Sequence, residues 1–136
     1  MALQQRLDES PFGYRSTAAE VIKGIDLTGK TVVVTGGYSG IGTETVRALA
    51  SVGAHVIVGA RRPEVAQANL TGIAGVTILP LELGEEVSID KFSAVVSSRM
   101  SQLDILINNA AIMAIPLTRD ERGYESQFAV NHLGHF

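Results

Sequence analysis

The sequence contains no cysteine and no tryptophan, and only 5% of its residues are aromatic. The absence of cysteine excludes disulfides, thiolate zinc sites and a cysteine nucleophile, and it fits a reducing compartment such as the cytosol. No segment reaches the roughly 18 consecutive apolar residues that a membrane-spanning helix needs. We therefore expect a soluble, cytoplasmic protein without a membrane partner.

The sequence also lacks an excess of charge of one sign. Its 11 basic and 14 acidic residues give a net charge of −3 and form no long run of like charge. A nucleic-acid partner would need clustered basic residues, so this class of partner is excluded. With 136 residues, 46% of them hydrophobic, the chain can bury the core of one ordinary domain. A small molecule is the partner that remains.

Four short apolar runs rich in β-branched residues alternate with segments whose apolar residues recur at helical spacing. Such runs are typical of strands buried on both faces of a parallel sheet. The alternation predicts an α/β fold, a doubly wound parallel sheet with right-handed crossovers and strand order 3-2-1-4. The predicted strands are residues 31–35, 55–59, 76–81 and 104–108, and the predicted helices are residues 18–23, 41–52, 63–70, 85–101 and 121–136.

A glycine-rich segment, Thr35-Gly-Gly-Tyr-Ser-Gly-Ile-Gly42, lies between the first strand and the helix that follows it. The amides and the dipole of a helix N-terminus form a site for a diphosphate, and glycines let the backbone turn and approach it. The alternative is a turn that needs glycine only for its backbone angles. We predict a dinucleotide-binding cradle made by Thr35, Gly36, Tyr38, Ser39, Gly40, Ile41 and Gly42.

Three segments together resemble the short-chain dehydrogenase/reductase family. Residues 35–42 resemble its Thr-Gly-x-x-x-Gly-Ile-Gly pattern, and residues 103–111 resemble its Leu-Asp-x-Leu-x-Asn-Asn-Ala-Gly, with Ala111 in place of the final glycine. Residues 123–136 are similar to the branch with retinol dehydrogenase-like and protochlorophyllide reductase-like enzymes. The resemblance implies a Rossmann-type NAD(P)-binding domain over residues 27–136, preceded by an extension, residues 1–26, with a short helix.

The end of the second predicted strand bears on the choice of nicotinamide cofactor. An acid there would accept hydrogen bonds from the adenosine ribose, but this chain has Arg61 and Arg62. A guanidinium suits the 2′-phosphate of NADP(H), which favours NADP(H) over NAD(H), with Arg61 as the main contact. The alternative is that both arginines only face water.

The resemblance implies further cofactor contacts. Glu82 and Leu83 stand where relatives carry the Asp-Leu pair beside the adenine, and Glu82 is one methylene longer. Asn108, Asn109 and Ala110 would line the ribose side at the end of the fourth strand. For the asparagines, the alternative is a local turn.

The resemblance implies hydride transfer between the nicotinamide and a small-molecule alcohol or carbonyl substrate, assisted by serine, tyrosine, lysine and asparagine. Asn131 matches the asparagine, whose family role is to hold a water against the lysine and to distort its helix. A helical asparagine that only bonds nearby backbone is the alternative. No Tyr-x-x-x-Lys occurs in the sequence. We therefore expect a chain truncated before the catalytic segment and inactive alone.

Several alternatives stay open beside this interpretation. A non-catalytic nucleotide-binding fragment or regulator would have the same cradle, and the full-length form could be a homo-oligomer. His132 and His135 share a helix face without a third ligand nearby, so we expect no metal. The apolar residues 110–117 suggest a pocket wall. A sheet that stops at its fourth strand leaves an apolar edge, which predicts aggregation or instability.

Overall fold

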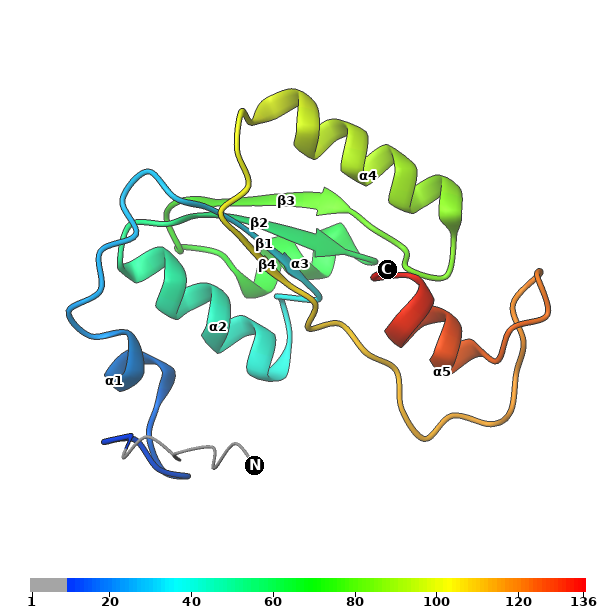
Figure 1. Cartoon of the computed structure of the whole chain (residues 1–136), viewed down its shortest axis with the longest axis horizontal. Coiled ribbons are helices and arrows are strands. Elements are labelled where there is room, and N and C mark those ends of the chain that lie inside the picture. Colours follow the sequence, from blue (N-terminus) through cyan, green and yellow to red (C-terminus); the bar gives the residue numbers. More distant parts are fainter. Residues whose placement is uncertain (1–9) are drawn as a thin grey trace, which may run out of the picture.

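The computed structural model describes residues 10–136, and the first nine residues of the predicted N-terminal extension lie outside the described part. A four-stranded parallel sheet forms the centre of the molecule, with the order β3-β2-β1-β4 (Figure 1). The predicted α/β fold class and strand order are confirmed. The strands are β1 (Thr31–Thr35), β2 (His55–Ala60), β3 (Val76–Pro80) and β4 (Ile105–Ile107).

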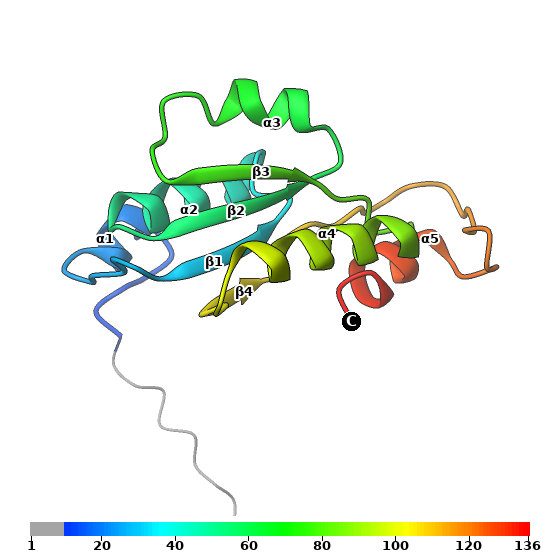
Figure 2. The same cartoon turned by 90° about the horizontal axis from the view of Figure 1, so that it is seen from above.

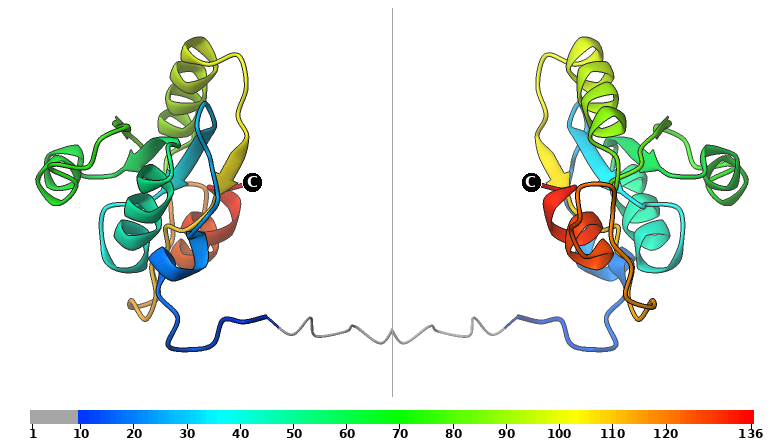
Figure 3. Two further views of the ribbon diagram at one scale, coloured as in Figure 1. Left: turned by 90° about the vertical axis from the view of Figure 1, so that its left-hand side faces the viewer. Right: turned by 90° about the vertical axis from the view of Figure 1, so that its right-hand side faces the viewer.

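Helices cover both faces of the sheet. They are α1 (Ala18–Ile22), α2 (Gly40–Ser51), α3 (Pro63–Asn69), α4 (Glu86–Arg99), the short α5 (Ser126–Phe128) and the π-helix η1 (Ala129–Leu133). Figures 2 and 3 show α4 on one face and α2 with α3 on the other. Most predicted boundaries lie within one or two residues of those observed, which is the usual uncertainty of helix and strand ends. Among residues 10–136, no helix has the length and apolar character needed to cross a bilayer.

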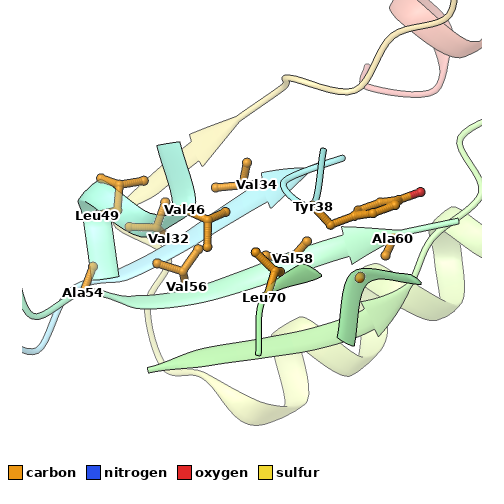
Figure 4. Packing of buried hydrophobic residues seen from close by; sticks show 11 residues of the cluster. Val32, Val34, Tyr38, Val46, Leu49, Ala54, Val56, Val58, Ala60 and Leu70 are labelled. Atoms are coloured by element: carbon orange, nitrogen blue, oxygen red, sulfur yellow. The ribbon is translucent and has the colours of Figure 1, made fainter. Parts of the chain in front are cut away.

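The alternation of side chains along β1 divides the core in two. Val32 and Val34 pack with Val46 of α2, whereas Val33 packs with Ile57 of β2 on the face that α4 covers. All of these side chains are at most 2% exposed. Figure 4 shows the larger cluster between the sheet and α2 with α3. The two central strands, β1 and β2, are therefore buried on both faces, as their apolar sequences predict.

The helix predicted over residues 121–136 is wrong at both ends. Asp120 accepts hydrogen bonds from the amides of Arg122 and Tyr124, and Gly123 has φ +89°, so residues 120–124 form a turn instead of a helical start. The helix begins only after Glu125, whose carboxylate accepts from the amides of Gln127 and Phe128. It ends at Leu133 and not at Phe136.

The N-terminal end of the described part matches its sequence pattern closely. Thr17 Oγ1 accepts from the amide of Glu20, and the Glu20 carboxylate accepts from the amide of Thr17. These reciprocal bonds are the capping box that the Thr-x-x-Glu spacing predicts. They fix the start of α1, which contacts α2 on the side away from the carboxyl edge of the sheet.

Candidate functional site

A cavity of about 530 Å³ opens at the carboxyl edge of the sheet, where β1, β2 and β4 end beside α5 (Figure 1). Parallel sheets of this kind bind their ligands at that edge, on either side of the first strand. Thirteen of the predicted site residues line the cavity: Thr35, Gly36, Tyr38, Ser39, Gly40, Ile41, Gly42, Arg61, Arg62, Glu82, Leu83, Asn109 and Ala110. Their role in binding stays a prediction.

Two of the predicted site residues do not line the cavity, and five residues that were not among them do. Asn108 and Asn131 lie outside the lining, whereas Gly59, Leu81, Ala111, Ile112 and Val130 belong to it. Ala111 and Ile112 belong to the apolar residues 110–117, which were expected to form a pocket wall. Val130 lies within the family-like segment 123–136, but its place on the cavity depends on how η1 packs against the sheet.

The glycine loop has the shape that a diphosphate needs. Gly36 and Gly40 have φ of +64° and +51°, which glycine adopts without strain. A Cβ added to Gly42 would come within 2.6 Å of the Gly36 carbonyl oxygen and 2.7 Å of Asn109 Nδ2, so α2 packs directly on the end of β1. The same addition at Gly40 meets nothing within 4 Å, which leaves space for a ligand.

The start of α2 is open to a ligand. Ser39 occupies the N-cap position, and its side chain makes no capping hydrogen bond. Residues 39–42 line the cavity, so the first turn of this 12-residue helix borders it without a capping side chain. An anion would satisfy the amides of that turn and interact favourably with the helix dipole. The residues present thus fit a dinucleotide diphosphate at this position.

Thr35 joins the ends of β1 and β4 beneath the glycine loop. Its side chain is buried, and Oγ1 accepts hydrogen bonds from the amides of Asn109 and Ala110, each at 3.0 Å. Asn109 Nδ2 in turn donates to the Thr35 carbonyl oxygen at 2.9 Å. These bonds fix the cavity wall that Asn109 and Ala110 contribute.

Arg61 and Glu82, which are predicted to contact the adenosine end of the cofactor, lie next to each other. Arg61 Nε lies 3.8 Å from Glu82 Oε2, and Glu82 Oε1 accepts from the amide of Gly84 at 3.2 Å. The Arg61 side chain is 57% exposed, so this ion pair is screened by water and contributes little stability. A phosphate at the mouth of the cavity would compete with Glu82 for the guanidinium on favourable terms, because it carries more charge.

Tyr38 belongs to the hydrophobic core of the protein, in addition to its predicted place in the glycine loop. Its side chain is 9% exposed and belongs to the core cluster with Ala60 and Leu70. Figure 4 shows the ring lying along β2, with the hydroxyl pointing toward the carboxyl end of the strand. Asn69 Nδ2 donates to the Tyr38 carbonyl oxygen at 2.9 Å. The loop is therefore held on its outer side by α3.

Asn131 fastens the loop that forms the far wall of the cavity. Its Oδ1 accepts from the amide of Ile112 and its Nδ2 donates to the Ile112 carbonyl, both at 2.8 Å. Asn131 lies within the π-helix, where the Gly134 amide donates to the Ala129 carbonyl at 2.7 Å. The helix distortion implied by the resemblance is present, and the side chain bonds the backbone of Ile112, 19 residues away in the sequence.

Electrostatic contacts hold the segment before η1. Backbone hydrogen bonds from Gln127 and Phe128 hold the pKa of Glu125 below its ordinary value. The Arg122 guanidinium contacts both Asp120 and Glu86, which ties the turn to the start of α4.

Within residues 10–136, no group of three or more potential metal ligands comes together.

Comparisons with known proteins agree with this geometry. The model of the family described as short chain dehydrogenase matches residues 30–136. The chain is 41% identical to the short-chain dehydrogenase TIC 32 B, chloroplastic, of Brassica napus over 94% of this chain and 42% of that protein. It is 41% identical to human retinol dehydrogenase 13 over 81% of this chain and 35% of that protein. The chain therefore spans about two fifths of the length of these relatives.

A solved structure supports the same assignment. The RhlG/NADP active-site complex of Pseudomonas aeruginosa superposes with a TM-score of 0.68 and 28% sequence identity. The match covers 82% of this chain and 45% of that protein. The parallel sheet with its covering helices is thus shared with a protein whose structure contains NADP.

Proposed function

This chain belongs to the short-chain dehydrogenase family, and we propose that it is the NADP(H)-binding part of an oxidoreductase acting on alcohol or carbonyl compounds. The observation that carries the proposal is the uncapped start of α2 behind Gly36 and Gly40, facing a cavity at the carboxyl edge of the sheet. Arg61 lies on the same cavity at the end of β2 and supports the choice of NADP(H).

Different residues of the cavity would bind different parts of the cofactor. The amides that open α2 would bind the diphosphate, and Arg61 with Arg62 would bind the 2′-phosphate. Glu82 and Leu83 would flank the adenine, and Asn109 with Ala110 would contact the nicotinamide ribose. When bound, the nicotinamide supplies or accepts the hydride.

Arg61→Ala tests the choice of cofactor. We expect it to weaken NADPH binding by about tenfold, the effect of losing one charge-assisted contact, and to leave NADH binding unchanged. Arg47→Ala is the matched control, because Arg47 lies on α2, pairs with Glu44 and does not line the cavity. Fluorescence titration with both nucleotides measures the effect. Equal losses for NADPH and NADH would exclude recognition of the 2′-phosphate.

The proton-transfer groups are proposed to follow Phe136 in a longer protein. In such a protein Asn131 would hold its water against the lysine. The test is an assay of the protein encoded by the whole reading frame with alcohols, aldehydes and ketones and both nicotinamide cofactors. If no compound in a broad panel is oxidised or reduced, the enzymatic proposal fails.

A non-catalytic nucleotide-binding regulator is the second candidate. It is supported by the cradle itself, which could bind a nucleotide without any catalytic step. The coding sequence after Phe136 discriminates between the two, because only the enzyme requires serine and Tyr-x-x-x-Lys there.

The location of the protein is a separate proposal. We propose a cytosolic location, supported by the absence of cysteine. One relative is described as chloroplastic, so microscopy of the tagged protein is the deciding measurement.

A further inference from the structure

His135 lies between two parts of the candidate site. Its Nε2 is 2.8 Å from Thr35 Oγ1, at the start of the glycine loop. Its Nδ1 is 3.1 Å from the carbonyl oxygen of Asn131. A single imidazole ring therefore connects the end of β1 with the π-helix, although Thr35 and His135 are 100 residues apart in the sequence.

The contact with Asn131 determines where the ring carries its proton. A carbonyl oxygen can only accept a hydrogen bond, so the hydrogen lies on Nδ1. In a neutral imidazole the other nitrogen is then an acceptor. Nε2 must consequently receive a hydrogen bond from the Thr35 hydroxyl.

The hydrogen bonds of Thr35 give the same answer independently. Its Oγ1 has two lone pairs, and the amides of Asn109 and Ala110 donate to this oxygen, each at 3.0 Å. Only the hydroxyl proton remains for His135. The Thr35 residue is 3% exposed, so water does not compete for that proton. Both ends of the bridge therefore require the neutral Nδ1–H form of His135.

We propose that His135 is a positioning residue that couples the dinucleotide cradle to the segment carrying Asn131. By accepting a hydrogen bond from the Thr35 hydroxyl, it directs the oxygen lone pairs toward the amides of Asn109 and Ala110, which shape the cavity wall. Through Nδ1 it donates to the backbone carbonyl of Asn131. The side chain of Asn131 in turn binds the backbone of Ile112 on the opposite wall. The proposal rests on the proposed function, because it requires a dinucleotide in the cavity.

His135→Phe tests the coupling in the protein encoded by the whole reading frame. The variant keeps an aromatic ring and removes both nitrogens. We expect it to weaken NADPH binding by about fivefold, the effect of losing one ordinary hydrogen bond. His132→Phe is the matched control, because His132 lies three residues before His135, within the π-helix, and its ring stacks on Phe128. Equal effects of the two substitutions would overturn the proposal.

A double-mutant cycle with Thr35→Val separates positioning from packing. If His135 acts through the Thr35 hydroxyl, His135→Phe changes NADPH affinity by less than about twofold once Thr35→Val has removed that hydroxyl. The same loss in both backgrounds would show that the ring only fills space, and would overturn the proposal.

The protonated nitrogen can be observed without any substitution. Long-range ¹H–¹⁵N correlation spectra of the histidine-labelled protein distinguish the two neutral forms of imidazole. We expect the Nδ1–H form for His135, and the Nε2–H form would overturn the bridge even if both variants failed to fold. If the unsubstituted protein bound neither NADPH nor NADH, the proposed function would fail, while this spectrum would still decide the state of His135.

Discussion

At the scale of single residues, several polar side chains connect elements that are distant in the sequence. Asp104 begins the segment leading into β4, and its carboxylate accepts from the Thr31 amide at 2.8 Å and from Lys30 Nζ at 3.0 Å. Its side chain is 13% exposed. Asp104 therefore fixes the entry of β4 beside β1, at the amino edge of the sheet and far from the cavity.

Asp104 makes the stability of the fold depend on pH. The Thr31 amide, together with Lys30, holds the pKa of Asp104 below the ordinary value. Because the folded state has the lower pKa, this contribution is complete above the ordinary pKa of about 3.9 and is lost as the pH falls through the folded value. Asp104→Asn should lower the denaturation midpoint at pH 7 and reduce its fall on acidification. Urea titrations between pH 7 and pH 2 measure both effects, and an unchanged acid profile would contradict the assignment.

Residue patterns were sufficient for most of the site and insufficient for its internal contacts. The places of the glycines and Arg61 on the cavity could be predicted because strand ends and turns can be located from local sequence, whereas Glu82 was predicted from the family resemblance. The contact of His135 with Thr35 could not be predicted, because it depends on how η1 packs against β1. Asn108 and Asn109 are neighbours of the same type, yet only Asn109 lines the cavity.

At the scale of elements, the last helix shows where periodicity fails. The β-branched strands were located to within a residue or two, because parallel strands buried on both faces have continuous apolar runs. The segment from residue 121 has helical spacing, but the Asp120 turn and the Glu125 cap delay its start to Ser126. A π-helix breaks the regular repeat, so spacing rules cannot reveal it.

Gly134 determines how closely η1 approaches the loop after β3. A Cβ at this position would overlap the backbone of Leu83, and it would lie 2.8 Å from Leu83 Cβ. Gly134→Ala should therefore force η1 away from Leu83 and destabilise the fold by about 1–3 kcal/mol. Gly84→Ala is the matched control, because its Cβ would meet only ordinary contacts beyond 3.5 Å. Chemical unfolding measures the difference, and equal stabilities would contradict close packing at Gly134.

At the scale of the whole molecule, the sheet ends in two edge strands, β3 and β4, and β4 exposes an apolar side chain. β4 pairs with β1, and within the described residues no strand lies on its other side. Leu106 in the middle of β4 is 53% exposed, although its neighbour across the sheet, Val33, is buried. An unpaired edge with an exposed apolar side chain is a template for association between chains.

The 136-residue chain by itself is consequently expected to self-associate. Leu106→Lys should reduce this association, because a charge at an open edge disfavours strand addition. Sedimentation velocity over a range of concentrations compares the two chains. A sharp cooperative melt and a monomer at all concentrations for the unsubstituted chain would refute the expectation. Leu117→Lys is a suitable control, because Leu117 is 76% exposed but lies on the loop after β4.

The fastening of the loop after β4 has a consequence for how this scaffold can diversify. The Ala114 amide donates to Gln127 Oε1 at 3.1 Å, and Thr118 Oγ1 lies 2.8 Å from Ser126 Oγ. Residues 115–117 form an arch between these two anchors. Insertions or exchanges confined to the arch would leave both anchors and the sheet intact. Related sequences can thus acquire new surface chemistry there without rebuilding the rest of the protein.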